Sequence, residues 1–293
     1  MGLRIKTNVA SVNAQRNMGL STNAMGESMQ KLSSGFRINK AADDAAGLAI
    51  SENMKGRIRS LSQARRNAAD GVSLVQVAEG SMNEVSNMLI RMRELATQAA
   101  SDTIGNKERE YTNREYVQLV NEIQRVANTT EWNGVPLLSG QGATGDDTMF
   151  TIHVGAGDGT VENTDTIRIG VENLKVNVAD MGLGTEGEIG PAEVGGDFAR
   201  ETAAQKLTVI DGALQGIASN RAYLGAQQSR LGSTLNNLGI QIENLSAANS
   251  RIRDVDFAEE TATFTQNKIL QSAGASVLAQ ANQTPEIALS LLR

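Results

Sequence analysis

The chain has 293 residues, no Cys and a single His, and only 3% of its residues are aromatic. The lack of Cys excludes disulfides and thiolate metal sites, and the single His leaves little room for His-based catalysis or metal binding. The net charge of −6 combines a basic start, an acidic middle and a mildly acidic end, so the two ends could attract each other.

Helices that pack through aliphatic side chains are the expected architecture. Large aromatic side chains normally build a compact core, so their scarcity argues against one. Only Pro136, Pro191 and Pro285 interrupt the chain, and long helices can run through the proline-free stretches. No apolar run is long enough for a transmembrane helix. The first residues lack the apolar run of a cleavable signal peptide.

Residues 5–34 form the first predicted element, a helix with a thin apolar stripe. Such a helix should be marginal alone and become ordered against a partner. Asp43 and Asp44 follow it, and because adjacent helical residues point about 100° apart, they do not form an acid–base pair. They are interpreted as charges at the start of the next helix. The apolar positions of the stripe are Ile5, Val9, Val12, Met18, Met25, Met29 and Leu32.

A coiled-coil-like seam is predicted over residues 54–99, since apolar residues recur there at steps of four and three. One extra step of three is a phase shift that long helices tolerate. Arg65 interrupts the seam, either as a polar residue that sets the register or as one that faces a neighbouring subunit. The seam positions are Met54, Ile58, Leu61, Arg65, Ala68, Val72, Val75, Ala78, Met82, Val85, Leu89, Met92, Ala96 and Ala99.

A shorter helix follows, predicted from Tyr116, Val120, Ile123 and Ala127 and ending before the turn signal Asn133-Gly134. The Gly-rich, acidic segment 140–197 then alternates apolar and polar residues, which predicts short strands or hairpins at the far end of the helical pair. The alternating sets are Phe150, Ile152 and Val154; Ile167, Ile169 and Val171; and Leu174, Val176 and Val178.

Two features of this middle segment could suggest a site, and both are better explained as structure. Gly182, Gly184 and Gly187 spell a GxGxxG motif, but no helix follows to hold a phosphate, so a flexible loop is expected. His153 has no Cys or other His as partner and starts no HExxH motif, which favours a surface role over metal binding. No cofactor or metal site is therefore predicted.

The second seam, over residues 207–252, alternates three and four without a fault. Its length equals that of the first seam, which predicts a long antiparallel pair. One narrow apolar seam cannot offset the ordering of some 45 residues at about 1–2 kcal/mol each, so a bundle is predicted. The positions are Leu207, Ile210, Leu214, Ile217, Arg221, Leu224, Gln228, Leu231, Leu235, Leu238, Ile242, Leu245, Asn249 and Ile252.

Residues 255–293 mirror the start of the chain, with a thin apolar stripe on a predicted helix. The last residues place apolar side chains next to a free terminus, an arrangement that calls for a binding groove. The stripe includes Ile269, Val277 and Leu278, and the apolar residues next to the terminus are Leu289, Leu291 and Leu292. We therefore expect a mainly α fold, with a terminal helical domain (1–42 plus 255–293) and a helical rod domain (43–254) that includes the 140–197 segment.

Several long blocks resemble the bacterial flagellins over essentially the full chain. They are residues 5–11 (Ile-Lys-Thr-Asn-Val-Ala-Ser), 31–39 (Lys-Leu-Ser-Ser-Gly-Phe-Arg-Ile-Asn), 41–50, 91–99, 275–283 and 289–293. The resemblance implies a structural subunit that polymerises into the flagellar filament, outside the cell, after type III export without a cleaved signal. The terminal segments would pair as a coiled coil lining the filament's inner tube.

The resemblance also implies partners. They are other copies of the chain, an export chaperone at the C-terminal helix, the filament cap and the hook-junction proteins. In many flagellins the host receptor TLR5 reads a patch whose matching positions here are Arg91, Leu95, Gln98 and Glu115.

Alternative functions fit less well. A hook–filament junction protein would share the export system, but the unbroken signature blocks favour the filament subunit. A coiled-coil scaffold would not need the apolar final residues, and an enzyme would need convergent catalytic residues that the chain lacks. The basic start has no interleaved aromatic residues for stacking on bases, so nucleic-acid binding is not expected.

Overall fold

The computed structural model describes residues 8–140, 149–157, 165–183 and 198–290, with backbone only at 198–201 and 284–290. The chain divides into two compact units: unit 1 comprises residues 1–58 and 243–293, and unit 2 comprises residues 59–242. Two long helices, α2 (Ala45–Ala99) and α4 (Phe198–Arg253), contribute to both units.

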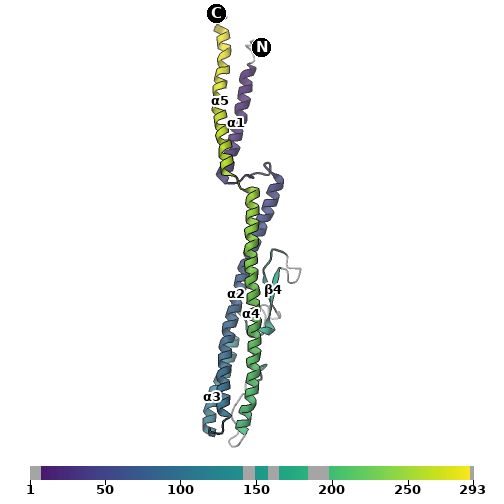
Figure 1. Ribbon diagram of the computed structural model, residues 1–293, viewed down its shortest axis with the longest axis vertical. Coiled ribbons are helices and arrows are strands. Elements are labelled where there is room, and N and C mark those ends of the chain that lie inside the picture. The colour runs from purple at the N-terminus through teal and green to yellow at the C-terminus, as the bar shows by residue number, and fades with distance from the viewer. Residues whose placement is uncertain (1–7, 141–148, 158–164, 184–197, 291–293) are drawn as a thin grey trace. The chain divides into compact units, whose positions relative to one another are not determined.

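Unit 1 contains an antiparallel pair of helices, α1 (Val9–Ser34) and α5 (Phe257–Ser290), coloured purple and yellow in Figure 1. The Asn8 side chain accepts a hydrogen bond from the Ser11 backbone N–H at 3.2 Å and so caps the start of α1. Gly35 ends α1 in the left-handed conformation (φ 74°), which glycine adopts without strain. The pairing of the two terminal segments is as predicted.

Unit 2 is built on α2, α4 and the shorter α3 (Asn106–Thr129), with α2 and α4 side by side in Figure 1. The seam residues of α2 and α4 share one apolar core with α3, and Arg93 of α2 pairs with Asp211 of α4. At the predicted seam positions in unit 2 the residues are buried or half-buried, apart from the exposed Arg65. Fully buried members include Val75, Met82, Leu89, Tyr116, Ile123, Ile210, Leu224 and Leu231.

The two arginines at seam positions, Arg65 and Arg221, differ in their surroundings. Arg65 is exposed to solvent, whereas Arg221 is half-buried and its Nε atom has no hydrogen-bond partner among the described residues. The predicted third helix is longer than its four seam residues, and all four are buried. Tyr116 is one of these four residues, and burial raises the pKa of its phenol to about 12.

Two short hairpins complete the described part of unit 2. The first pairs β1 (Glu131–Trp132) with β2 (Val135–Pro136) through a turn in which Asn133 and Gly134 both have positive φ, as expected for Asn-Gly. The second pairs β3 (Met149–His153) with β4 (Thr166–Gly170) in antiparallel register. Residues Val171–Asn173 then form the 3₁₀ helix η1.

Two details of the middle segment differ from the sequence-based expectation. Residues 174–178 are not a strand, although Leu174, Val176 and Val178 are buried at alternate positions as predicted. The Val176 N–H donates to the Leu138 carbonyl at 2.9 Å, so this stretch satisfies its backbone without a ladder. The β3–β4 hairpin lies alongside the helices rather than at their far end, since Ile152 packs over Gly71 of α2.

Candidate assembly surfaces

The interface between α1 and α5 combines small and polar residues with a few large apolar ones. Its half-buried or buried positions recur at steps of three and four on both helices, the pattern of a coiled-coil seam. They are Ser11, Ala14, Met18, Ser21, Met25, Ser28 and Leu32 on α1, and Glu260, Phe264, Asn267, Gln271, Gly274, Leu278 and Ala281 on α5. Large apolar residues alone indicated Met18, Met25, Leu32 and Leu278 of this seam, and the small and polar positions between them gave no signal.

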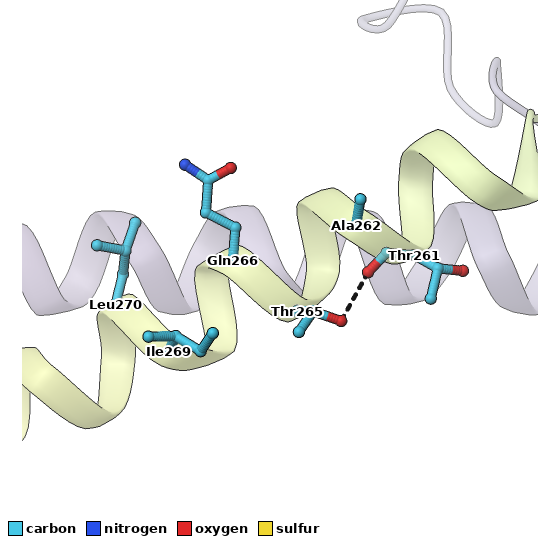
Figure 2. A pocket seen from close by; sticks show the side chains of 6 residues that line it. All are labelled: Thr261, Ala262, Thr265, Gln266, Ile269 and Leu270. Carbon is cyan, nitrogen blue, oxygen red and sulfur yellow. Dashed lines mark hydrogen bonds between the residues drawn. The ribbon is translucent and has the colours of Figure 1, made fainter.

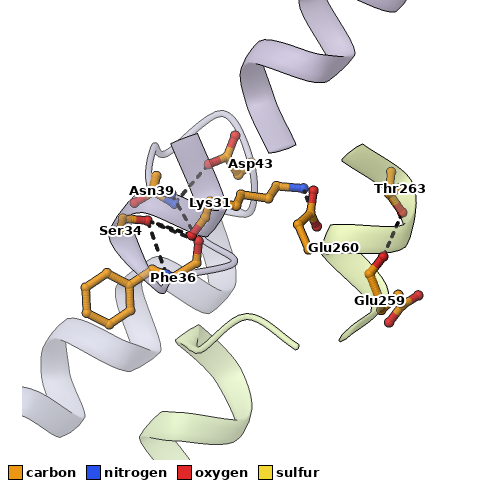
Figure 3. Close-up of polar contacts among 8 residues, drawn as sticks. All are labelled: Lys31, Ser34, Phe36, Asn39, Asp43, Glu259, Glu260 and Thr263. Atoms are coloured by element: carbon orange, nitrogen blue, oxygen red, sulfur yellow. Dashed lines mark hydrogen bonds and ion pairs between the residues drawn. The ribbon is translucent and has the colours of Figure 1, made fainter. Parts of the chain in front are cut away.

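Hydrogen bonds and one ion pair fix the register of the two helices. The Asn8 side chain donates to the Ala281 carbonyl at 2.7 Å, and Gln271 donates to the Thr22 hydroxyl at 3.2 Å. At the other end, Lys31 pairs with Glu260 at 3.7 Å, as Figure 3 shows. Exposed polar contacts of this kind contribute about 0–1 kcal/mol each, so they hold the two helices together only weakly.

Large apolar residues lie on the outer faces of the same two helices. Val9 is 66% exposed and Ile269 is 64% exposed, although aliphatic side chains of this size are usually buried. Val12, Leu20, Phe257, Leu270 and Val277 are exposed in the same way. Of the ten sequence-predicted assembly residues, Leu32 and Leu278 lie on the seam instead. Ile5, Leu289, Leu291 and Leu292 have no described side chains.

A shallow groove follows the outer face of α5 around Ile269. Figure 2 shows that its lining comes from successive turns of this one helix. The Thr265 hydroxyl donates to the Thr261 carbonyl at 2.8 Å, which satisfies it within the helix and leaves mainly methyl groups facing outward. The lining residues are Thr261, Ala262, Thr265, Gln266, Ile269 and Leu270.

Backbone pairing in unit 1 joins the segment after α1 to the segment after α4. The Arg37 N–H donates to the Arg253 carbonyl at 2.7 Å, and the Val255 N–H donates to the Gly35 carbonyl at 3.0 Å. Between these two bonds, Phe36 and Asp254 form an antiparallel bridge. Ile38, next along the chain, is fully buried. This connection therefore has a defined conformation although both segments lie outside the long helices.

Arg253 is the centre of this connection. Its guanidinium lies 4.7 Å from the centroid of the Phe36 ring, a cation–π contact. The same group donates to the Glu52 carboxylate of α2 at 2.5 Å, and this hydrogen bond, together with the charges of Lys55 and Arg253, lowers the pKa of Glu52. No sequence pattern indicated this cluster, because its members come from three distant segments.

Of the adjacent Asp43 and Asp44, Asp44 serves the start of α2 and Asp43 holds the turn before it. Asp44 accepts a hydrogen bond from the Gly47 N–H at 2.8 Å and caps the helix. Asp43 accepts from the N–H groups of Lys40 and Asn39, each at 2.9 Å, and these two bonds lower the pKa of its carboxyl. Figure 3 places Asn39 and Asp43 beside the end of α1.

Acid should loosen this connection. A carboxyl whose pKa is lowered in the folded state stabilises the fold above its unfolded pKa, and that contribution disappears as the pH falls through the folded pKa. The ordinary pKa values of Glu52 and Asp43 are 4.5 and 3.8. The stabilisation is therefore lost at pH values below these. We expect Glu52→Gln to flatten the acid limb of the unfolding midpoint against pH. An acid limb identical to that of the unaltered chain would contradict the role of Glu52.

In unit 2, the positions that match the receptor patch have different exposures. Arg91 pairs with Glu94 at 2.9 Å on its own helix and with Glu115 of α3 at 2.8 Å. Gln98 is exposed, but Leu95 is only 1% exposed and belongs to the core. The accessible part of this patch is therefore polar and consists of Arg91, Gln98 and Glu115.

The described residues contain no cluster that could hold a metal ion. His153 is exposed at the end of β3, and its carbonyl accepts a hydrogen bond from Asn67. Gly182 has a positive φ in a turn, and Gly184 and Gly187 of the GxGxxG motif lie outside the described residues. Among the helices that the structure describes, none is both long and apolar enough to span a membrane.

Comparison with known proteins decides the family. Residues 5–143 match the model of the bacterial flagellin N-terminal helical region, and residues 207–292 match that of the C-terminal helical region. The chain is 44% identical over 99% of its length to 99% of a flagellin from Halalkalibacterium halodurans, and 40% identical over 99% of its length to the whole of a flagellin from Bacillus subtilis.

The chain belongs to the bacterial flagellin family. It is a filament subunit of the bacterial flagellum, a structural protein of the extracellular filament, which it forms by association with other copies. Among solved structures, it resembles the crystal structure of Bacillus cereus flagellin with 30% identity and a TM-score of 0.48, over 63% of this chain and 94% of that one. The prediction of a filament subunit for motility is thus confirmed for this flagellin.

Proposed function

We propose that the terminal helices α1 and α5 are the assembly domain of this flagellin, whose packing is completed by neighbouring copies in the filament. This domain corresponds to residues 1–42 and 255–293, and residues 43–254 form the rod. The observation that carries the proposal is the inversion of the helix pair. Its inner seam mixes small and polar residues with Leu32, Phe264 and Leu278, whereas Val9, Val12, Ile269 and Val277 face outward.

The energetics favour this division of roles. Full burial of one aliphatic side chain of this size contributes about 1.5–3 kcal/mol. Among the described residues, the Lys31–Glu260 ion pair and the side-chain hydrogen bonds between α1 and α5 contribute about 0–1 kcal/mol each. Burial of the four outward residues against other copies therefore adds a stabilisation that these polar contacts do not supply. The apolar residues Ile5, Leu289, Leu291 and Leu292 belong to the same proposal on their sequence positions.

The substitution Ile269→Glu tests it. A charge in the centre of the outer groove of α5 should abolish elongation, because burying an unpaired carboxylate is costly. Elongation is measured by light scattering from filament seeds and by electron microscopy. The helical content of the monomer, measured by circular dichroism, should be unchanged because Ile269 is exposed.

Two control variants make this test specific. Ile269→Leu keeps an apolar side chain and should elongate normally. Tyr111→Glu places the same charge at a residue that is equally exposed, at 64%, but lies on α3, and it should also elongate. Normal filaments from Ile269→Glu would refute the assignment of α5 to assembly.

Other partners are proposed on the family resemblance and on the exposed surfaces. The groove on α5 suits an export chaperone that holds this helix before secretion, and co-purification with a chain lacking residues 257–293 tests it.

The exposed Arg91, Gln98 and Glu115 would carry contacts to TLR5, and receptor-ectodomain binding by Glu115→Ala tests that. The cap and hook-junction proteins would contact the same terminal helices.

A further inference from the structure

The outward face of α2 in unit 2 carries charges that have no ion-pair partner among the described residues. Arg59, Arg66, Asp70 and Glu84 are all exposed. They follow one another at steps of seven, four and fourteen residues, which keep side chains on one face of a helix. Arg66 donates to Gln63 on its own helix, and the side chains of the other three form no hydrogen bond or ion pair with the part of the chain that the structure describes.

The order of these charges along the helix is asymmetric. Both arginines come first and both carboxylates come later, with the exposed Val77 between the carboxylates on the same face. Elsewhere in unit 2, exposed charges are often paired, as in Arg114–Glu110 and Arg125–Glu122. A stripe of unpaired charges separated by sign is therefore unusual for this surface.

The asymmetry selects a kind of partner. The basic half of the stripe in one copy is complementary to the acidic half of the stripe in a second copy. A contact in which two different patches of the same chain meet is heterologous, and repeating it produces an open helical filament when the rotation does not close a ring. In a filament, the two halves of the stripe in one copy would therefore face two different neighbouring copies.

We propose that the basic half of this stripe (Arg59 and Arg66) binds the acidic half (Asp70 and Glu84) of a neighbouring copy in the filament. This inference rests on the proposed function, because it adds a contact between rod domains to the assembly driven by the terminal helices. Charged contacts of this type mainly steer association and fix the register. Elongation of the unaltered chain should consequently slow as salt is raised, since the Debye length is about 8 Å at 0.15 M.

The test uses two charge-reversed variants. The acidic variant, Arg59→Glu with Arg66→Glu, carries negative charge in both halves of the stripe. The basic variant, Asp70→Lys with Glu84→Lys, carries positive charge in both halves. Each variant alone should elongate more slowly than the unaltered chain, on the order of tenfold, because like charges then face each other. An equimolar mixture should recover the lost rate, since the two variants are complementary when they alternate.

Controls separate this inference from the proposed function. Circular dichroism must show that both variants are folded, and Lys107→Glu, an exposed reversal on α3, should elongate at the unaltered rate. If either variant alone elongates like the unaltered chain, or if the mixture stays as slow as its parts, the charge contact is refuted. That result leaves assembly through α1 and α5 intact, since Ile269→Glu tests it independently.

Discussion

Replacing Leu235 with Pro is expected to collapse α4 and destabilise unit 2. Residue 235 lies in the interior of α4, where proline removes a backbone hydrogen bond and its ring clashes with the carbonyl four residues earlier. The cost is about 3 kcal/mol or more, to which lost burial of the half-buried leucine adds. For a unit of this size such a loss lowers the melting temperature on the order of 10 °C.

Thermal melts followed by circular dichroism measure this effect. Leu235→Met is the matched control, because it conserves volume and should cost less than about 1.5 kcal/mol. Both substitutions are at the same seam position, and only proline removes the backbone N–H there. A melt of the proline variant that overlays that of the methionine variant would show that α4 is not a continuous helix at this residue.

Replacing Arg109 with Ala is expected to destabilise unit 2 by about 2–4 kcal/mol, the usual cost of orphaning buried hydrogen-bond partners of a charged group. Arg109 is buried on α3. Its guanidinium donates to the carbonyls of Ala99 and Ser101, at 3.0 and 2.9 Å, and to Asn106 at 3.2 Å. Ala99 is the last residue of α2, so the positive charge also complements the negative end of that helix.

Urea denaturation of the full chain gives the free energy of unfolding for this variant. Arg109→Lys should fall between the unaltered chain and Arg109→Ala, since it keeps the charge but cannot form the fork of bonds. Amide hydrogen exchange should speed up first in the last turn of α2. Unchanged exchange there, with an unchanged denaturation midpoint, would rule out this capping role.

Residue patterns predicted the helical seams where large side chains dominate the buried surface. The seams on α2 and α4 and the buried face of α3 follow from the spacing of Leu, Ile, Val and Met, as does the Asn133-Gly134 turn from its chemistry. Residues 174–178 show the limit of this reasoning. Their alternating burial was predicted, but period-two burial needs only an extended chain, and a strand also needs a neighbour at the right distance.

The terminal helices show a second limit. Their apolar residues were identified from the sequence, but which side of each helix they occupy depends on the register between α1 and α5. The seam includes Ser, Ala and Gly beside Met, Leu and Phe, since small residues let the two backbones approach and polar ones hydrogen-bond across. Counting small residues at steps of three and four could have found it.

The sequence by itself determined the family, the helical class, the two long seams and the lack of catalytic constellations, because each rests on local spacing or on long ordered motifs. Only the tertiary structure decided that Phe36, Glu52 and Arg253 meet, that Leu95 is in the core while Arg91 is not, and that Val9 and Ile269 face outward. These facts depend on contacts between residues far apart in the chain, and a local pattern carries no information about which distant segments will pack together.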